Sequence, residues 1–504
     1  MAHGGIRYLE NGEFRLVREA VQERNRMIEN APHIVHPLPT TIPIFKIFSG
    51  LLNAPLKFFN LLDRPSERGA LVIKIGLMFY DAFTRDQKTV PPHQVASRKE
   101  SLKRWKSLNP RVRYAATYYD GAILEPERLA VEMLLDAEAD QPGARALNYV
   151  SLAGGKMNFV TLEDKLTGDK FDVKPRLLIN AAGPWIDEAN ANLGLSTRFI
   201  GGTKGSHLIL DNPELRAAIG SHEFFFENDD GRIVLIFPFY DKVLVGTSDL
   251  PIDDPDEARC TEEEVDYFLE MIGIVFPAIK VTREEIVFRF SGVRPLEFSG
   301  AKTTGQISRD HTIQELSGIW TGQDYPIYSL VGGKWTSFRA FAEQVTDKAL
   351  GYLGLAREQD TRSLPIGGGR NYPQNDEERK RMLNGIYAWT NLSPERMQTL
   401  FERYGTRVEE IALFISQGED APLESLPIFS RREIEFLAQN EKIVHLTDFV
   451  LRRSNLAKLG LLNSAIVDEL ADVLGESLGW DGLRKLSEVT RTRNLLADRH
   501  NVRL

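Results

Sequence analysis

Apolar and polar positions alternate with the period of a helix or a strand over most of the chain. Residues 11–30 carry apolar side chains at helical spacing with charged residues between them, which predicts an amphipathic helix. Residues 125–139 predict a second helix, and Pro126 suits its first turn because no backbone N–H is needed there. Shorter apolar runs predict strands at residues 146–152, 156–162 and 170–173, of which the last two form a small meander.

Residues 176–185 are typical of a buried strand that leads into a helix. The apolar run Leu177-Leu178-Ile179 passes into the small residues Ala181-Ala182-Gly183, and Pro184 follows at the expected start of the helix. A strand that is apolar on both faces is typical of a parallel sheet covered by helices. This part of the chain therefore predicts an α/β unit.

The pattern changes between residues 206 and 292. Short β-type runs predict strands at residues 207–210, 233–237, 243–245 and 285–290, with one helix near 262–274. A separate, mainly β domain with a broad sheet is the simplest interpretation. Beyond it, Gly367-Gly368-Gly369 between two prolines predicts a linker over about 365–375, followed by helices only. Ser393-Pro394 predicts one helix start, and Ser430 with Glu433 has the spacing of a capping box.

Length and composition indicate a large globular protein. The chain has 504 residues, which suggests about three domains, and 42% of them are hydrophobic and 26% charged. Its net charge of −9 argues against a dedicated nucleic-acid-binding protein. Cys260 is the one cysteine, which excludes a disulfide framework and a cysteine-based metal site, and we predict no bound metal.

The stretch between Pro37 and Leu62 is the most apolar of the chain. Prolines and lysines at positions 43, 46, 55 and 57 interrupt it, so it is not expected to span a bilayer. No acidic residue occurs from Asn30 to Leu62, although the whole chain is acidic. An apolar, locally basic segment suits contact with a membrane surface, whereas a buried loop and helix would have the same composition. Both interpretations stay open.

Several short segments are built from small, backbone-permissive residues, and all but one of them also hold a cation. They are Gly4-Gly5-Ile6-Arg7-Tyr8, Asn180-Ala181-Ala182-Gly183-Pro184-Trp185, Gly202-Thr203-Lys204-Gly205-Ser206-His207, Ser291-Gly292-Val293-Arg294-Pro295-Leu296, Ser308-Arg309-Asp310-His311 and Gly332-Gly333-Lys334-Trp335-Thr336-Ser337, of which the second has no cation. Glycine lets backbone N–H groups approach an anionic oxygen, and Arg or Lys supplies positive charge. Each segment alone is also typical of an ordinary turn. Together they favour an anion site, in a chain that holds no G-x-G-x-x-G or Walker A motif.

These segments, in this order, resemble the FAD-dependent glycerol-3-phosphate dehydrogenase family of the aerobic or respiratory type. The resemblance runs from residue 3 to the C-terminus and includes Tyr119-Asp120-Gly121 followed by Glu127-Arg128-Leu129. It implies oxidation of sn-glycerol 3-phosphate to dihydroxyacetone phosphate, with electrons passed to FAD and then to a membrane quinone. It also implies a homodimer that is cytoplasmic and peripherally associated with the inner face of the cytoplasmic membrane.

The resemblance implies roles for individual residues. Arg7 and Tyr8 are expected to face the substrate, and Arg309 to join the cations that bind its phosphate. Lys334 and Arg294 are expected to bind substrate oxygens near the flavin. His207 is the expected base, because Arg294 hardly deprotonates and suits stabilisation of a developing alkoxide; a structural strand-end histidine is the alternative. Contacts to FAD are expected from Gly4, Gly5, Ala182, Gly183, Gly332, Gly333 and Thr336.

The implied fold is α/β plus α. A discontinuous Rossmann-like FAD-binding domain is expected from residues 1–36, 121–200 and 301–364. A mainly β substrate domain with a broad antiparallel sheet is expected from residues 37–120 and 201–300, with membrane contact at 37–62. Residues 370–504 are expected to form an all-helical cap.

The family's N-terminal strand, G-x-G-x-x-G turn and helix do not precede His3, so the FAD-binding domain is expected to be truncated. We therefore expect that the chain as printed binds FAD poorly or not at all, and a misplaced start or a real truncation would each explain it. Three alternatives to the quinone-linked enzyme stay open. They are an oxidase that uses O2, an inactive homologue that cannot hold flavin, and another amine or hydroxy-acid oxidase.

Overall fold

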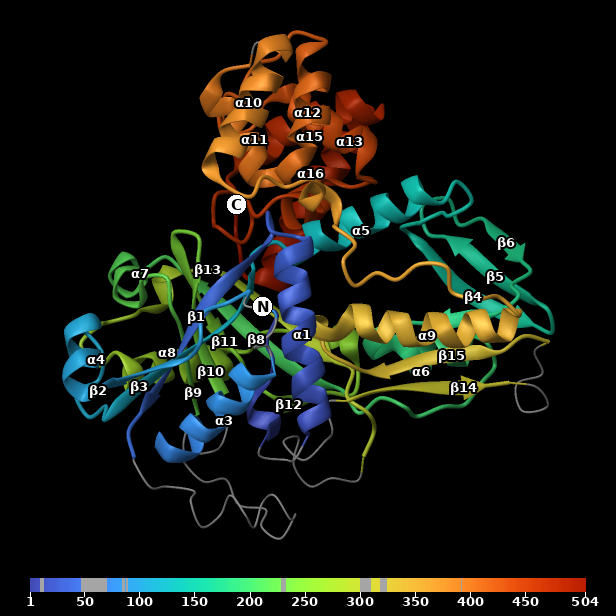
Figure 1. Ribbon diagram of the computed structural model, residues 1–504. Helices are drawn as coiled ribbons and strands as arrows, with labels where there is room; N and C mark the ends of the chain where they lie inside the picture. The colour runs from blue at the N-terminus through green and yellow to red at the C-terminus, as the bar shows by residue number, and fades with distance from the viewer. Residues whose placement is uncertain are drawn as a thin grey trace.

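The computed structural model describes residues 1–9, 13–46, 70–83, 87, 89–227, 233–299, 310–317, 324–390 and 392–504. Two sheet regions lie side by side below a group of helices formed by the C-terminal part of the chain (Figure 1). The two helices predicted near the N-terminal side are confirmed as α1 (Phe14–Asn30) and α5 (Pro126–Asp140). Pro126 does stand in the first turn of α5.

A nine-stranded sheet confirms the broad sheet of the mainly β region. Its order is β12-β8-β11-β10-β9-β1-β3-β2, with β13 also paired to β8, and only β1 and β9 run parallel. The strands are β1 (Val35–Ile44), β2 (Gln94–Ser97), β3 (Tyr114–Ile123), β8 (Thr203–Leu210), β9 (Glu223–Glu227), β10 (Ile233–Phe239), β11 (Lys242–Gly246), β12 (Leu250–Pro251) and β13 (Ile286–Arg294).

Both faces of this sheet are covered. Leu208 and Leu210 of β8 pack on one face with α8 (Glu262–Val275), α7 (Pro213–Ile219) and the segment after α4 (Arg98–Arg104). Ile209, between them, points to the other face and belongs to the core shared with the C-terminal helices. Because side chains alternate along the strand, one face of the sheet packs against α7 and α8 and the other face packs against the C-terminal helices.

The membrane interpretation of residues 37–62 is wrong for its first part. Residues 37–44 lie within β1, where Ile42 and Ile44 are buried in the core. Residues 47–62 lie outside the described residues. Among the described residues, no helix has the length and apolar composition needed to cross a membrane.

A smaller sheet carries the α/β unit. Its order is β14-β15-β7, formed by β14 (His311–Leu316), β15 (Ile327–Gly332) and β7 (Leu178–Asn180), with β15 and β7 parallel. The turn η2 (Gly183–Trp185) and α6 (Ile186–Asn192) follow β7 as predicted, and α9 (Phe338–Leu353) follows β15. The meander is confirmed as β4 (Val150–Lys156), β5 (Phe159–Asp164) and β6 (Lys170–Val173), although its first strand begins at Val150 instead of residue 146.

The C-terminal region is helical, as predicted. It contains α10 (Asp376–Thr390), α11 (Pro394–Tyr404), α12 (Val408–Ser416), α13 (Arg431–Asn440), α14 (Leu446–Asp448), α15 (Ser464–Leu478) and α16 (Gly482–His500). Ser393 caps α11 by accepting from the Arg396 N–H at 3.2 Å. Ser430 caps α13, but the Glu433 side chain does not complete the box; its carboxylate accepts hydrogen bonds from Tyr404 at 2.7 Å and Arg403 at 2.8 Å instead.

The predicted linker at 365–375 is a packed junction. Gly367–Gly369 form a short helical turn, η8, and all three glycines are buried. A Cβ on Gly368 would lie 2.0 Å from the carbonyl oxygen of Tyr404, and one on Gly369 would lie 2.3 Å from that of Asn30. The glycines are therefore needed because the backbones of α1 and the helical region approach closely here.

Candidate active site

The segment at residues 3–8 lies against the turn that follows β15. The His3 N–H donates to Thr336 Oγ1 at 2.9 Å, and the Thr336 hydroxyl donates back to the His3 carbonyl at 3.1 Å. Lys334 Nζ lies 3.9 Å from the centre of the Tyr8 ring. Gly5 has a φ of +73°, and a Cβ there would meet the Tyr8 ring at 2.3 Å. Residues 3, 5 and 8 are thus brought together with residues 334 and 336, which lie more than 320 positions away in the chain.

Glycines 332 and 333 shape the turn between β15 and α9. Their φ angles are +76° and +94°, and a Cβ on Gly332 would lie 2.5 Å from the Asp310 carbonyl oxygen. The short helical turn η7 (Trp335–Ser337) then leads into α9. The first N–H groups of a helix have no partner within the helix and create a positive potential. Together with Lys334, they make this end of the sheet suited to electron-rich groups.

Ala182 and Gly183 lie at the same end of the sheet. They directly follow β7, which pairs in parallel with β15, so the carboxyl ends of both strands meet at one edge. Buried Asn180 fixes the turn by donating to the Ile186 carbonyl at 3.0 Å and to Asn190 Oδ1 at 2.8 Å. The turn η2 packs against both β15 and β13, so it stands between the smaller sheet and the larger one.

His207 and Arg294 form a second group on neighbouring strands of the large sheet. His207 stacks on Phe290, its cross-strand partner, with ring centres 4.9 Å apart. The Arg294 guanidinium donates to Thr247 Oγ1 at 2.8 Å and to the Ser248 carbonyl at 3.1 Å. Its ion pair with Asp249 spans 3.3 Å. The end of β11 therefore holds Arg294 in a fixed orientation.

Burial and the Arg294 charge lower the pKa of His207 from 6.5 to about 3. The imidazole is therefore neutral near pH 7 and one ring nitrogen is able to accept a proton. Its buried Nδ1 has no hydrogen-bond partner within the part of the chain that the structure describes. In the described residues, therefore, no backbone group bonds to Nδ1, as it would in a structural strand-end histidine held through this atom.

Of the predicted substrate residues, the structure does not describe Arg309 and describes only the backbone of Arg7. Arg309 lies outside the described residues. Arg7 belongs to the short helical turn η1 (Ile6–Leu9), but its side chain also lies outside the description. The group at the turn after β15 and the group of His207 and Arg294 therefore consist of the other predicted residues.

Sequence reasoning missed the residues that hold these groups in place. Thr247 and Asp249 orient Arg294, and Asp120 accepts a hydrogen bond from the Gly4 N–H at 3.1 Å. A signal was present for Asp120, since it is the one charged residue in β3. For Thr247 and Asp249, the signal is a cluster of small polar residues at the end of an apolar strand.

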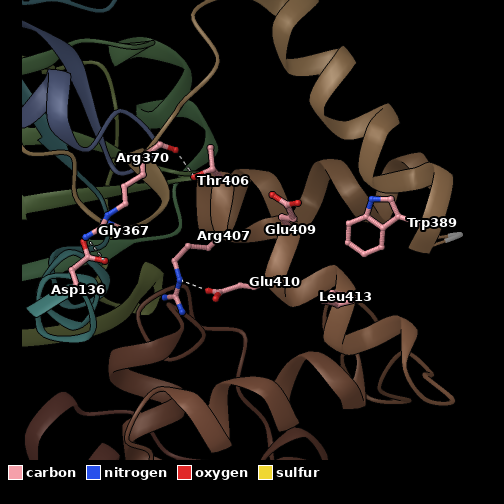
Figure 2. A pocket seen from close by; sticks show the side chains of 9 residues that line it. All are labelled: Asp136, Gly367, Arg370, Trp389, Thr406, Arg407, Glu409, Glu410 and Leu413. Carbon is pink, nitrogen blue, oxygen red and sulfur yellow. Dashed lines mark hydrogen bonds and ion pairs between the residues drawn. The ribbon is translucent and has the colours of Figure 1, made fainter. Parts of the chain in front are cut away.

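A pocket at the junction with the helical region is separate from these groups (Figure 2). It is lined by Asp136, Gly367, Arg370, Trp389, Thr406, Arg407, Glu409, Glu410 and Leu413. Both of its arginines are paired, Arg370 with Asp136 at 3.3 Å and Arg407 with Glu410 at 2.6 Å. None of the predicted site residues lines it, and its cations are already neutralised.

Comparison with known proteins agrees with the resemblance noted in the sequence. Residues 1–346 match the family described as FAD dependent oxidoreductase, and residues 359–485 match the C-terminal domain of alpha-glycerophosphate oxidase. A glycerol-3-phosphate dehydrogenase from Synechocystis is 32% identical, over 91% of this chain and 81% of that protein. An aerobic glycerol-3-phosphate dehydrogenase from Staphylococcus haemolyticus is 28% identical, over 94% and 83% of the two chains.

The fold is also similar to that of a solved structure. The glycerol-3-phosphate dehydrogenase from Bacillus halodurans, complexed with FAD, matches with a TM-score of 0.72 at 21% identity, over 94% of this chain and 84% of that one. The first family match alone covers more than half of the chain. The protein described here therefore belongs to the glycerol-3-phosphate dehydrogenase family of FAD-dependent oxidoreductases, and FAD is its cofactor.

Proposed function

We propose that this protein oxidises sn-glycerol 3-phosphate to dihydroxyacetone phosphate and passes the electrons through FAD to a membrane quinone. The observation that carries the proposal is the meeting of Tyr8, Lys334 and Thr336 at one glycine-lined turn. Two relatives that match more than 90% of this chain are named glycerol-3-phosphate dehydrogenases, which supports the substrate.

The residues at this turn fit a flavin. A Cβ on Gly183 would have no atom within 4 Å, so open space lies beside the carboxyl end of β7. In the proposal, FAD is held by Gly4, Gly5, Ala182, Gly183, Gly332, Gly333 and Thr336. When bound, FAD supplies the acceptor for the hydride that leaves the carbinol carbon of the substrate.

Lys334 is the central substrate-binding cation of the proposal. Its ammonium group lies over the electron-rich face of Tyr8, which attracts the positive charge and helps to fix its position. Arg7 and Arg309 complete the phosphate-binding set with Tyr8 in the proposed arrangement. A phosphate dianion needs several cations and N–H groups, because burying it without partners is costly.

His207 takes the hydroxyl proton of the substrate in the proposed reaction, and Arg294 stabilises the developing alkoxide. The neutral state of His207 supports this role, although a pKa of about 3 makes a weak base. An anionic substrate beside the ring raises the pKa of the imidazole towards the working pH. Arg294 is already oriented by Thr247 and Ser248, so little reorganisation is needed during the reaction.

Helix α3 (Ala70–Ala82) supports the membrane part of the proposal. Ile75, Met78 and Phe79 form one face of it and are 48%, 57% and 46% exposed, and Lys74 lies beside them. Exposed apolar side chains next to a cation suit the surface of an anionic bilayer, where a quinone is dissolved. We place the protein at the inner face of the cytoplasmic membrane, as a homodimer by resemblance to the family.

An oxidase that reduces O2 is a second candidate, because the C-terminal region matches that of alpha-glycerophosphate oxidase. The two functions differ only in the electron acceptor. An oxygen electrode distinguishes them directly. Rapid oxygen consumption with glycerol 3-phosphate in the absence of quinone would favour the oxidase.

The experiment that tests the proposal uses the purified full chain with added FAD under anaerobic conditions. Glycerol 3-phosphate should bleach the visible flavin absorbance and release dihydroxyacetone phosphate, and a soluble quinone should restore the colour. Glycerol, which lacks the phosphate, is the control and should leave the absorbance unchanged. Bleaching by amino acids or 2-hydroxy acids but not by glycerol 3-phosphate would contradict the proposed substrate.

A further inference from the structure

We propose that Asp120, together with Tyr80 and Arg24, is a positioning device for residues 3–8, the segment that meets the flavin and the substrate. The inference rests on the proposed function, because that function assigns Gly4, Gly5 and Tyr8 to the active site. None of the three positioning residues would touch the substrate. They would act through the backbone of Gly4.

The three side chains converge on one backbone N–H group from three different elements. The Gly4 N–H donates to the Tyr80 hydroxyl at 3.0 Å and to Asp120 Oδ1 at 3.1 Å. The Tyr80 hydroxyl in turn donates to Asp120 Oδ1. Arg24 Nη1 donates to the Tyr80 hydroxyl at 3.1 Å and lies 3.6 Å from Asp120 Oδ1. Helix α1, helix α3 and strand β3 are thereby joined to residue 4.

The burial of this cluster needs an explanation. Arg24, Asp120 and Tyr80 are 0%, 1% and 2% exposed. Burying an ion pair seldom stabilises a fold more than apolar side chains of the same size would. Burial also raises the pKa of Asp120, which the Arg24 charge and the bonds from Tyr80 and Gly4 oppose. Apolar side chains could not accept a hydrogen bond from the Gly4 N–H, whereas Tyr80 and Asp120 do.

The space around Gly4 shows how tightly the segment is held. A Cβ on Gly4 would lie 2.2 Å from Val21 Cγ1 and 2.3 Å from the Tyr80 hydroxyl. On one side of Gly4, His3 is bonded to Thr336, and on the other, Gly5 and Tyr8 lie against Lys334. A shift of Gly4 would therefore move both the flavin-side contact and the substrate-side contact. Displacements of about 1 Å are enough to lower turnover strongly.

Two tyrosine substitutions form a matched test. Tyr80→Phe removes a buried hydroxyl that donates to Asp120, and Tyr404→Phe removes a buried hydroxyl that donates to Glu433 at 2.7 Å in the helical region. Hydrogen–deuterium exchange of the peptide covering residues 1–9 should become about 10-fold faster in Tyr80→Phe, since loss of a buried hydrogen bond opens the segment locally. It should not change in Tyr404→Phe.

One further readout and one further pair of variants separate positioning from a general loss of stability. The affinity for FAD, measured by quenching of its fluorescence, should fall in Tyr80→Phe and not in Tyr404→Phe. Asp120→Asn keeps an oxygen acceptor for the Gly4 N–H and should lie closer to wild type than Asp120→Ala in both measurements. Equal effects of the two tyrosine substitutions, or unchanged exchange of residues 1–9 in Tyr80→Phe, would overturn the inference. Neither readout needs turnover, so an enzyme inactive on glycerol 3-phosphate would contradict the proposed function alone.

Discussion

Lys334 and Tyr8 are 326 positions apart in the chain, and the ammonium group of the lysine lies 3.9 Å from the centre of the tyrosine ring. The contact joins the N-terminal segment to the turn before α9. A cation–π contact of this kind contributes about 0.5–2 kcal/mol, depending on how dry its surroundings are. Substituting one member of this pair therefore tests whether the substrate binds beside it.

Lys334→Met should raise the KM for glycerol 3-phosphate and lower kcat/KM by about 10- to 100-fold, because a charged hydrogen bond contributes about 1.5–3 kcal/mol. Lys348→Met is a suitable control, since Lys348 lies 5.3 Å from the Tyr328 ring centre but stands in the C-terminal half of α9, where it pairs with Glu315 at 2.7 Å. Steady-state kinetics with an artificial electron acceptor measures both. Equal losses in the two variants would show that Lys334 does not bind the substrate.

Arg294→Ala should lower kcat by about 100- to 1000-fold, as loss of a preoriented group that stabilises charge does in other enzymes. Flavin binding should persist, because Arg294 is bonded to Thr247, Ser248 and Asp249 and not to the glycine turn. Rapid-reaction measurement of flavin reduction checks the rate, and fluorescence titration checks FAD binding. Arg283→Ala, which removes a partly exposed arginine that pairs with Glu262 and Asp266, serves as the control. Retained turnover in Arg294→Ala would mean that its role is misassigned.

Glu223→Gln should stabilise the protein more at alkaline pH than at acidic pH. Burial and the Asp120 charge raise the pKa of the fully buried Glu223 from 4.5 to about 8. The folded protein therefore keeps a proton on Glu223 that the unfolded chain releases, so stability is lost as the pH rises from about 4.5 through 8. Glutamine cannot ionise and should raise the free energy of unfolding by at least about 1 kcal/mol at pH 8, and by less at pH 5.

Urea unfolding at the two pH values measures this difference. Thr40 donates to Glu223 Oε2 at 2.9 Å, and the amide oxygen of glutamine can accept the same bond. The substitution should therefore leave the packing of β1 against β9 unchanged. A stability change of the same size at both pH values would show that Glu223 is not protonated in the folded protein.

Gly368→Ala and Gly385→Ala should have opposite effects on stability. The new methyl group at residue 368 would lie 2.0 Å from the Tyr404 carbonyl oxygen, so the two chain segments would have to separate. At residue 385, within α10, nothing lies within 4 Å, and alanine is favoured over glycine in a helix by about 0.5–1 kcal/mol. Thermal unfolding should show a lower Tm for the first variant and an equal or higher Tm for the second. A neutral result at residue 368 would contradict the tight junction.

The sequence pattern predicted elements whose periodicity was undisturbed. Helices α1 and α5, the meander and β8, β10, β11 and β13 were all expected near their observed positions. Strand β1 was missed because Pro37, Pro39 and Pro43 argue against a strand. All three prolines stand at odd-numbered positions, so the N–H groups that they lack would all face the same edge of the strand. The other edge keeps its N–H groups and is able to pair.

The motif segments contain the residues that meet at the turn between β15 and α9, but they do not show what holds these residues. Asp120 and Gly4 are 116 positions apart, and Arg24 and Tyr80 are 56 apart. Periodicity describes one element at a time, so contacts between elements that far apart cannot be derived from it. The same limit applies to Gly367–Gly369, whose composition alone is that of an exposed connection.

The buried triplet at residues 367–369 has a consequence for anyone who wishes to divide or recombine this protein. Its composition is typical of a domain boundary, because flexible linkers between domains are often rich in glycine. Here the Gly367 N–H donates to Asp136 at 2.7 Å and the Gly368 N–H donates to Glu132 at 3.0 Å. Severing the chain there would leave buried Glu132 and partly buried Asp136 without these bonds on one fragment, and would expose backbone on the other. A chimera of two relatives would need its crossover elsewhere, or would need to take α5 and the triplet from the same parent.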